Sequence, residues 1–318
     1  MKKVLTVLAV LMMCAALFAQ GSQEATTSTY PDKKVTFIIP YNAGGGTDTL
    51  MRLLASAMEK DWGQQVIISN KAGGMGQVGL TELSAAKADG YTIGALSNLD
   101  HVLVLKTSEN VAYTYDSFEY LGAINTTCNV LYANDKLGFK SVDDMLAYAK
   151  ANPGKLTVAI SGKTHIAEAT LLEQKAGIKV TTVMQNSGND SLKAILGGHV
   201  DMAIMDKNFV AQVEGKGVSP LASFGAERIS KIKDVATFTE LGYPVATETY
   251  RVIVAPKGTP KEICEKITAT INKVSSDPEF QKTMDGMKEI YRYLDASQVK
   301  ARLDQDVALV DSIKDALK

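Results

Sequence analysis

The stretch from Lys34 to Arg52 reads KVTFIIPYNAGGGTDTLMR and decides how the fold begins. Its first part is an apolar run that stops at Pro40, which is typical of a buried β-strand. Three consecutive glycines, Gly44 to Gly46, come next, and Thr47-Asp48 opens a segment with apolar residues at helical spacing. The stretch therefore predicts a buried strand, a glycine loop and the N-terminus of a helix, in that order.

This order of elements favours the binding of an anion. The first backbone N–H groups of a helix have no partner within the helix, and the helix dipole places roughly half a positive charge there. Glycine allows a close approach of the backbone and a positive φ. We therefore expect Gly45 to lie where the backbone approaches a ligand, with a φ that a branched side chain does not tolerate. A carboxylate is a suitable ligand for such a loop.

Residues 1–19 have the features of a secretory signal. Two lysines precede an almost wholly apolar run, and Ala19 is a small residue suited to cleavage. The run is too short for a comfortable membrane span. We expect cleavage after Ala19 and a periplasmic location, with lipidation at Cys14 as the alternative. Residues 20–29 are polar and are expected to form a disordered spacer.

Composition narrows the class of protein further. The chain has 318 residues, which leaves enough length after the signal for two domains. The net charge of −1 does not indicate a nucleic-acid partner. The three histidines lack metal-ligand spacing, so we expect no metal and no other cofactor. Beyond the signal only Cys128 and Cys264 remain, and a disulfide and two buried free thiols are equal alternatives.

Strand-like and helix-like segments alternate along the rest of the chain. The further strands predicted from apolar and β-branched runs are 66–69, 91–96, 120–124, 130–133, 156–160, 180–184, 202–205, 218–224 and 251–254. The further helices are 74–87, 141–150, 165–176, 190–196, 260–274 and 296–317, with Ser141 as a cap and Gly177 as a stop. Repeated β-α units with buried strands indicate α/β domains with parallel, doubly wound sheets, which bind ligands at the carboxyl ends of their strands.

Five blocks in a fixed order give the chain a family resemblance. They are Tyr30-Pro31 with Pro40 to Asp48 and Gly63-Gln64; Val66 to Asn70 with Gly73-Gly74-Met75-Gly76 and Asp89-Gly90-Tyr91-Thr92; Ala151 to Leu156; Leu196 to Asp201; and Pro256 to Pro260. In these blocks the chain resembles the tripartite tricarboxylate transporter substrate-binding proteins, also called the Bug receptors. The resemblance runs from about Tyr30 to the C-terminus.

The resemblance implies a two-domain periplasmic-binding-protein fold of the type II-like kind, in which each domain is a mostly parallel sheet flanked by helices. It implies domain 1 at 30–131 plus 251–318 and domain 2 at 132–250. The ligand, a small organic acid, would lie in the interdomain cleft, and the domains would close on it. The receptor, expected to be a monomer and not an enzyme, would hand the ligand to membrane transporter subunits.

The candidate ligand-binding residues follow the strands of this scheme. They are Tyr41, Asn42, Ala43, Gly44, Gly45, Gly46, Thr47, Asp48, Gly74, Met75, Ser97, Asn98, Asn125, Thr126, Ser161, Thr164, His165, Asn186, Ser187 and Asp206. Asp48 either holds the glycine loop as a cap or touches the ligand, and Ser161 is either a ligand contact or a helix cap. A nucleotide-binding reading of Ser161 to Thr164 fails because a phosphate loop needs a glycine where Thr157 stands.

Departures from the family pattern fall on these loops. Asn42 and Ala43 replace two prolines, and Asn186-Ser187 replace a Tyr-Lys pair, which removes a cation. Without an arginine clamp in the matched loops, anion capture would rest on helix N-termini and bound water. The identity of the ligand stays open. The rival functions are a sensor that feeds a signalling partner and a secreted hydrolase or lyase, although the Gly-x-Ser-x-Gly nucleophile motif is absent.

Overall fold

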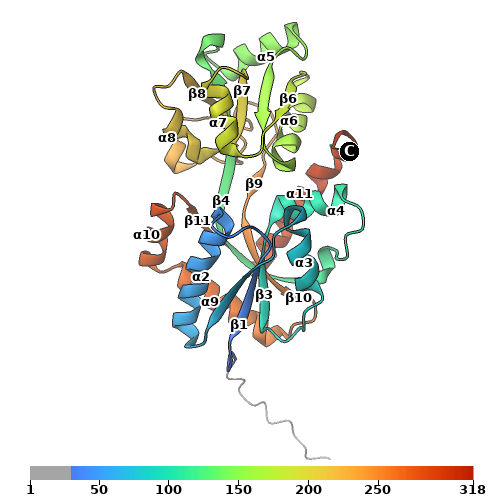
Figure 1. The fold of residues 1–318 in the computed structure, drawn as a ribbon, viewed down its shortest axis with the longest axis vertical. Coiled ribbons are helices and arrows are strands. Elements are labelled where there is room, and N and C mark those ends of the chain that lie inside the picture. The colour runs from blue at the N-terminus through green and yellow to red at the C-terminus, as the bar shows by residue number, and fades with distance from the viewer. Residues whose placement is uncertain (1–29, 318) are drawn as a thin grey trace, which may run out of the picture.

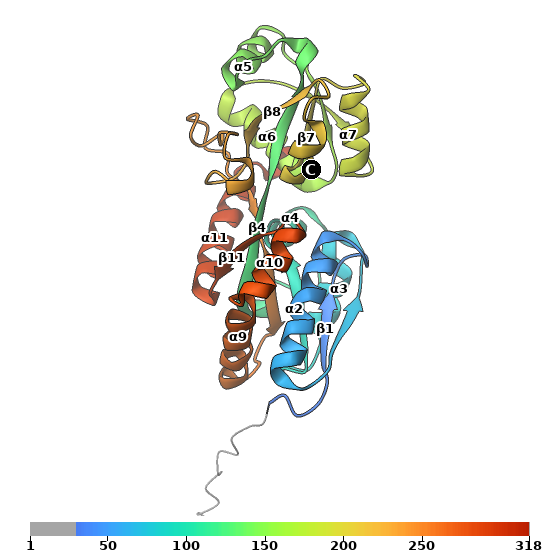
Figure 2. The same cartoon turned by 90° about the vertical axis from the view of Figure 1, so that its left-hand side faces the viewer.

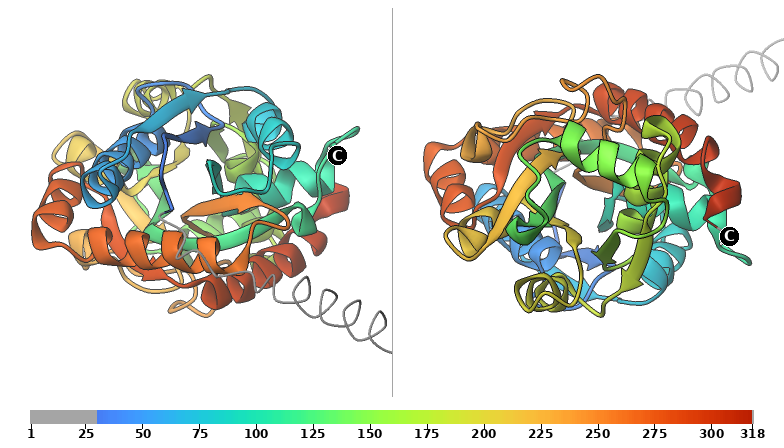
Figure 3. Two further views of the ribbon diagram at one scale, coloured as in Figure 1. Left: turned by 90° about the horizontal axis from the view of Figure 1, so that it is seen from below. Right: turned by 90° about the horizontal axis from the view of Figure 1, so that it is seen from above.

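The computed structural model describes residues 30–317 and forms two lobes stacked along the long axis of the molecule (Figures 1 and 2). The expected signal at 1–19, the lipidation alternative at Cys14 and the spacer at 20–29 lie outside the described residues. Strands form the interior of each lobe, and helices lie around them when the molecule is viewed from either end (Figure 3). Within residues 30–317, every helix is too short or too polar to cross a bilayer.

The first lobe is built on the predicted opening strand. β1 (Val35–Ile39) lies between β2 (Val66–Asn70) and β3 (Thr92–Ser97), and both pairs are parallel. β10 (Arg251–Pro256) extends the sheet antiparallel to β3, although it comes from the distant end of the chain. The sheet is therefore mixed, and its parallel part is the one that carries the glycine loop.

β4 (Phe118–Asn134) is one continuous strand of 17 residues that runs from one lobe into the other (Figure 1). The sequence predicted two separate strands here, at 120–124 and 130–133, and that prediction was wrong. The intervening residues NTTCN look like a loop because they are polar, yet backbone ladders continue through them. β10 and β11 (Ile290–Leu294) pair with residues up to Thr126, and β9 (Glu248–Thr249) pairs with the next two.

The second lobe completes its sheet on the far half of β4. β7 (Met202–Asp206) and β8 (Val218–Ser223) flank β4 as antiparallel neighbours. β5 (Thr157–Ile160) pairs in parallel with β7 and with β6 (Thr181–Met184). The two-lobed α/β prediction is confirmed, and both sheets are mixed because β4 is antiparallel to the strands on each side of it. The exact domain limits expected at 131/132 and 250/251 stay a prediction.

Helices cover both sheets. In the first lobe they are α2 (Gly46–Trp62), α3 (Gln77–Ser84), α4 (Asn98–Thr107), α9 (Lys261–Ser275), α10 (Pro278–Gly286) and α11 (Ala296–Asp311). In the second they are α5 (Val142–Ala151), α6 (Lys163–Ala176), α7 (Gly188–Leu196) and α8 (Val210–Val213). The predicted helix at 74–87 is instead a 3₁₀ turn, Gly74–Gly76, followed by α3. The sequence did not predict α4, α8, α10, β9 or β11.

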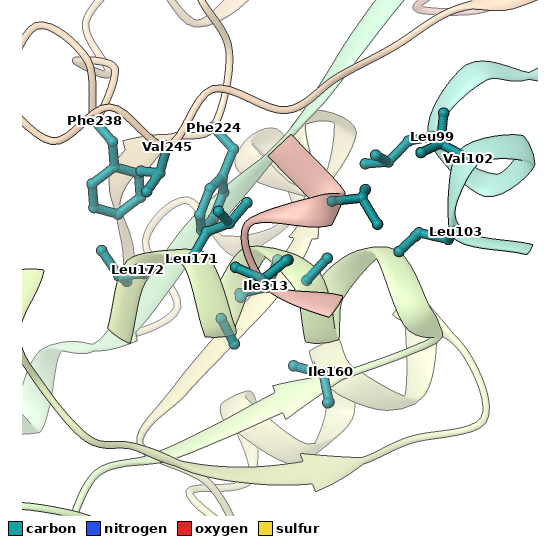
Figure 4. Packing of buried hydrophobic residues seen from close by; sticks show 14 of the residues in the cluster. Leu99, Val102, Leu103, Ile160, Leu171, Leu172, Phe224, Phe238, Val245 and Ile313 are labelled. Atoms are coloured by element: carbon teal, nitrogen blue, oxygen red, sulfur yellow. The ribbon is translucent and has the colours of Figure 1, made fainter. Parts of the chain in front are cut away.

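An apolar seam joins the two lobes beside β4. Leu99, Val102 and Leu103 of α4 belong to the same buried cluster as Leu171 of α6 and Ile313, which follows α11 (Figure 4). α4 packs directly on α6 and on α11. Since buried apolar surface is the main source of stability, this seam holds the lobes together independently of any ligand.

We predict that Leu103→Ala destabilises the protein by about 2–5 kcal/mol, because the deletion leaves a cavity in the seam. Leu103 is fully buried, whereas Leu241 is 40% exposed. The matched change Leu241→Ala should therefore cost only about 0.5 kcal/mol, as is usual at surfaces. Urea unfolding followed by circular dichroism measures both. Equal effects of the two changes would contradict the seam.

Candidate ligand-binding site

The glycine loop between β1 and α2 is held by a buried carboxylate. Asp48 is 2% exposed, and its Oδ2 accepts hydrogen bonds at 2.8 Å from the Gly44 N–H and from Arg52 Nε. Its Oδ1 accepts a 2.8 Å bond from Asn70 Nδ2 at the end of β2. Asp48 therefore ties the glycine loop to the neighbouring strand. Of the two roles that the sequence allowed, this is the one in which Asp48 holds the loop. A direct contact of Asp48 with a ligand stays a prediction.

The same contacts set the ionisation of Asp48. Burial alone raises the pKa of a carboxyl group, but the hydrogen bonds from Arg52, Asn70 and Gly44 stabilise the charged form. Together they hold the pKa of Asp48 below its ordinary value of 3.8. The carboxylate is therefore charged at neutral pH and fully committed to the loop.

The glycine that needs a special backbone conformation is Gly44 rather than Gly45. Gly44 has a φ of +79°, whereas Gly45 is the residue before α2 and has an ordinary φ of −75°. The expectation for the φ of Gly45 was therefore wrong. No side chain caps the N-terminus of α2, so its first N–H groups remain available in the exposed loop formed by Asn42, Ala43, Gly44, Gly45 and Gly46.

A polar cluster bridges the two lobes in front of this loop. Thr164 Oγ1, in the first turn of α6, donates to Asp100 Oδ1 of α4 at 3.1 Å. Tyr41 Oη donates to Asp100 Oδ2 at 3.3 Å and accepts from the Ser97 N–H at 3.2 Å. Burial raises the pKa of Asp100, and the nearby charge of Arg251 opposes this. We call Tyr41, Thr47, Asp100, Thr164 and Arg251 the interlobe cluster.

Arg251 supplies the cation of the interlobe cluster. It is the first residue of β10, and its Nε donates to Thr47 Oγ1 at 2.7 Å while its backbone N–H donates to Asn125 Oδ1 at 3.0 Å. Its Nη1 is buried and has no hydrogen-bond partner. A buried guanidinium N–H without a partner is costly, so it marks a place where an acceptor belongs.

Neither Arg251 nor Asp100 was among the sequence candidates. The available signal for Arg251 was a single charged residue at the head of an apolar strand, RVIVAP. Asp100 lies in the first turn of α4, a helix that the sequence did not reveal. Asp100 reaches the loop after β1 because β3 pairs with β1, and Arg251 reaches it because β10 pairs with β3.

The start of α6 faces the same region from the second lobe. Gly162, with a φ of +92°, precedes the helix, and no side chain caps it, so the alternative of Ser161 as a cap was wrong. Instead the Ser161 N–H donates to His165 Nδ1 at 2.9 Å. Burial lowers the pKa of His165 to about 4. The imidazole is therefore neutral, and its proton lies on Nε2, where it serves as a donor.

Several predicted ligand-binding residues form hydrogen bonds within the protein. Asn98 is fully buried and bonds the Glu248 carbonyl, Asp306 and the Tyr250 N–H. Asn125 bonds Arg251 and, through Nδ2, Glu289. These amides hold the crossing between the lobes, so their availability to a ligand is limited. Ser97 contributes its backbone N–H to Tyr41.

The remaining predicted residues differ in their burial and in their hydrogen-bond partners. The Thr126 hydroxyl is buried without a partner. Asp206 accepts from Thr127 Oγ1 and the Asn208 N–H, and Ser187 caps α7. Asn186 and Gly74 are exposed, and Met75 has a φ of +56° within its 3₁₀ turn. Direct ligand contact by all of these residues stays a prediction.

Two surface cavities are lined by residues outside the interlobe cluster. One of about 480 Å³ lies between α2, α9 and α10, and one of about 310 Å³ is lined by Tyr250 and Asp306. The interlobe cluster is therefore defined by its contacts.

Residues 30–317 contain no group of three or more His, Cys, Asp or Glu side chains placed to hold a metal ion. Cys128 and Cys264 are free thiols.

Comparison with known proteins decides the class of this receptor-like fold. The sequence model described as "Tripartite tricarboxylate transporter family receptor" matches residues 50–313. The chain belongs to this family. The resemblance inferred from the five blocks is thus confirmed, and the protein is a solute-binding receptor of the tripartite tricarboxylate transporter kind.

Individual relatives agree with this assignment. Protein BugT of Bordetella pertussis is 28% identical over 281 residues, which cover 86% of this chain and 84% of that protein. A TctC solute-binding protein from Polaromonas has a TM-score of 0.80 and 25% identity, covering 89% of this chain and 99% of that one. MatC from Rhodopseudomonas palustris with bound malate has a TM-score of 0.71 at 23% identity, covering 91% and 100%, and shows the same fold.

We predict that Gly44→Ala in this receptor costs about 1–3 kcal/mol, because an alanine is strained at that positive φ. Gly46→Ala should cost nothing or stabilise slightly, since the position has open space and begins a helix. Thermal unfolding of both variants checks the difference. An unstrained Gly44→Ala variant would mean that the loop adopts another conformation.

We predict that Asp48→Asn costs about 1–3 kcal/mol at pH 7, since an amide cannot accept all the bonds that the carboxylate accepts. Because the folded pKa of Asp48 lies below 3.8, the stability that its charge contributes is present above that unfolded value. It is lost as the pH falls through the lower folded pKa. Urea unfolding should therefore show the gap between wild type and Asp48→Asn shrinking below about pH 4. The exposed change Asp304→Asn is the control, and a gap that stays constant with pH contradicts the role of Asp48.

Proposed function

We propose that this receptor captures a small carboxylate-containing solute between its lobes and delivers it to the membrane subunits of a tripartite tricarboxylate-type transporter. The observation that carries this proposal is the buried Nη1 of Arg251, which has no partner and lies in the interlobe cluster. A carboxylate oxygen is the acceptor that a guanidinium N–H favours most, since both partners are charged.

The surroundings of Arg251 support an anionic ligand. The uncapped N-termini of α2 and α6 approach the interlobe cluster from opposite lobes, and each offers free N–H groups with a partial positive charge. The hydroxyls of Tyr41 and Thr164 and the Nε2–H of His165 add neutral donors. Malate in a protein of the same fold is a ligand of this class. The ligand-facing loops lack an arginine, as the sequence indicated, but the site as a whole has one, Arg251 at the start of β10.

Closure of the lobes is the proposed mechanism of capture. A ligand that bonds Arg251 and Tyr41 on one lobe and the start of α6 on the other favours the arrangement in which both sets of donors are close. The relatives are binding proteins, so we propose that the ligand leaves chemically unchanged. We also propose export to the periplasm through a cleaved signal at 1–19, as a monomer.

We predict that Arg251→Met weakens carboxylate binding about 10- to 100-fold, which is the loss of one charged hydrogen bond. The control is Arg228→Met, which removes an exposed arginine that is paired with Glu240 and does not belong to the cluster. Calorimetry with a ligand found by thermal shift from a panel of carboxylic acids gives both affinities. An unchanged affinity in Arg251→Met removes this residue from the site.

A bound ligand should also stabilise and compact the wild-type receptor. At a hundredfold excess over the dissociation constant, linkage predicts about 2.7 kcal/mol of added stability. Small-angle scattering should show a smaller radius of gyration with ligand, and chromatography should recover the ligand unchanged. A true ligand that leaves the radius of gyration unaltered contradicts closure, and a ligand converted to product contradicts the receptor function.

A further inference from the structure

Asp100 is an acidic side chain within the cluster that we propose binds a carboxylate. The proposed function does not explain why an acidic residue stands there. Asp100 accepts hydrogen bonds from the hydroxyls of Thr164 at 3.1 Å and Tyr41 at 3.3 Å, and the Ser97 side chain also favours its charged form. Both bonds are at the long end for hydroxyl donors. Arg251 lies close enough to act on Asp100 through its charge, which opposes the effect of burial on the Asp100 pKa. Burial raises the pKa of Asp100, so its charged form lacks a sufficient partner, and Arg251 is an incompletely paired cation.

Charge balance distinguishes the ligands that such a site can bury. When Asp100 is ionised, Arg251 and Asp100 together have no net charge, and a buried charge is tolerated only when it is paired. A simple carboxylate satisfies Arg251 but adds a second anion next to Asp100. A molecule that carries both a carboxylate and an ammonium group satisfies both residues and adds no net charge.

The geometry offers each half of such a ligand its own partners. The carboxylate half has Arg251 Nη1 and the free N–H groups at the starts of α2 and α6. The ammonium half has the oxygens of Asp100, in place of the weak hydroxyl donors. The neutral His165 brings no competing positive charge, because burial lowers its pKa to about 4.

We infer that the ligand is an amino carboxylate, such as an α-amino acid, and that Asp100 is the specificity-determining residue which binds its ammonium group while Arg251 binds its carboxylate. This inference rests on the proposed function, because it assumes that the interlobe cluster is the binding site. It makes Asp100 a discriminator: a carboxylic acid that lacks the ammonium group gains nothing from Asp100 and is repelled by its ionised form.

Matched ligand pairs test this inference directly. Each amino acid is compared by calorimetry with the acid that lacks only its amino group, for example aspartate with succinate, glutamate with glutarate and alanine with propionate. At least one amino acid should bind the wild-type receptor about tenfold or more tighter than its partner acid, which is the gain from one charged hydrogen bond. Asp100→Asn should abolish that preference by weakening the amino acid, and should leave the partner acid bound as well as before or better.

Two further variants separate specificity from structure. Asp304→Asn, an exposed change of the same chemistry on α11, should keep the full preference. Circular dichroism and thermal unfolding show whether Asp100→Asn is folded, and Asp100→Glu, which keeps the charge, replaces it if it is not. The glutamate variant should retain a preference for amino acids.

The outcomes separate the two proposals. Partner acids that bind the wild type as tightly as the amino acids overturn the role of Asp100 and leave the carboxylate receptor intact. An equal gain in affinity for both ligands in Asp100→Asn also overturns it, because it would show that Asp100 is a latch between the lobes. If no member of either series binds, or if Arg251→Met changes no affinity, the proposed function fails as well.

Discussion

The arrangement of this receptor depends on one backbone constraint, the passage of β4 through both sheets. Its first half pairs with β10 and β11 and its second half with β7 and β8, while β9 pairs at the crossing. Each lobe can therefore be completed only around the same strand. Because the ladder hydrogen bonds run continuously through residues 125–129, the lobes meet at a fixed place, with the ends of β1, β3 and β5 facing one another.

The interlobe cluster follows from that constraint. Arg251 begins the strand that returns beside β4, so the guanidinium lies at the crossing between the lobes. Asn98 lies two residues before Asp100 in the first turn of α4. It forms hydrogen bonds with the Tyr250 N–H and with Asp306, which links the start of α4 to the same crossing. A ligand that pairs with Arg251 and Asp100 would thus act close to the crossing about which we propose that the lobes close. Recognition and closure would use the same few residues.

Local sequence was sufficient where the physics is local. The strand, glycine loop and helix at 34–52 follow from an apolar run, three glycines and a helix start, and the structure has all three. The cap of α5 by Ser141 and the end of α6 at Gly177 are likewise properties of a few adjacent residues. By contrast, the polar stretch at 125–129 looks like a loop, because its hydrogen-bond partners, among them Asp206, Glu168 and Arg251, come from distant parts of the chain.

The sequence by itself determined the family, the two-lobed α/β class and the strand, glycine loop and helix start at 34–52, since these rest on ordered motifs and on local patterns of residues. Only the tertiary structure decided which charges meet. Arg251 and Asp100 are 151 positions apart, and neither stands in a motif. Their meeting depends on β3 and β10 being sheet neighbours and on α6 approaching from the other lobe. Long-range pairing of this kind is set by the packing of the whole chain, which no local pattern of residues encodes.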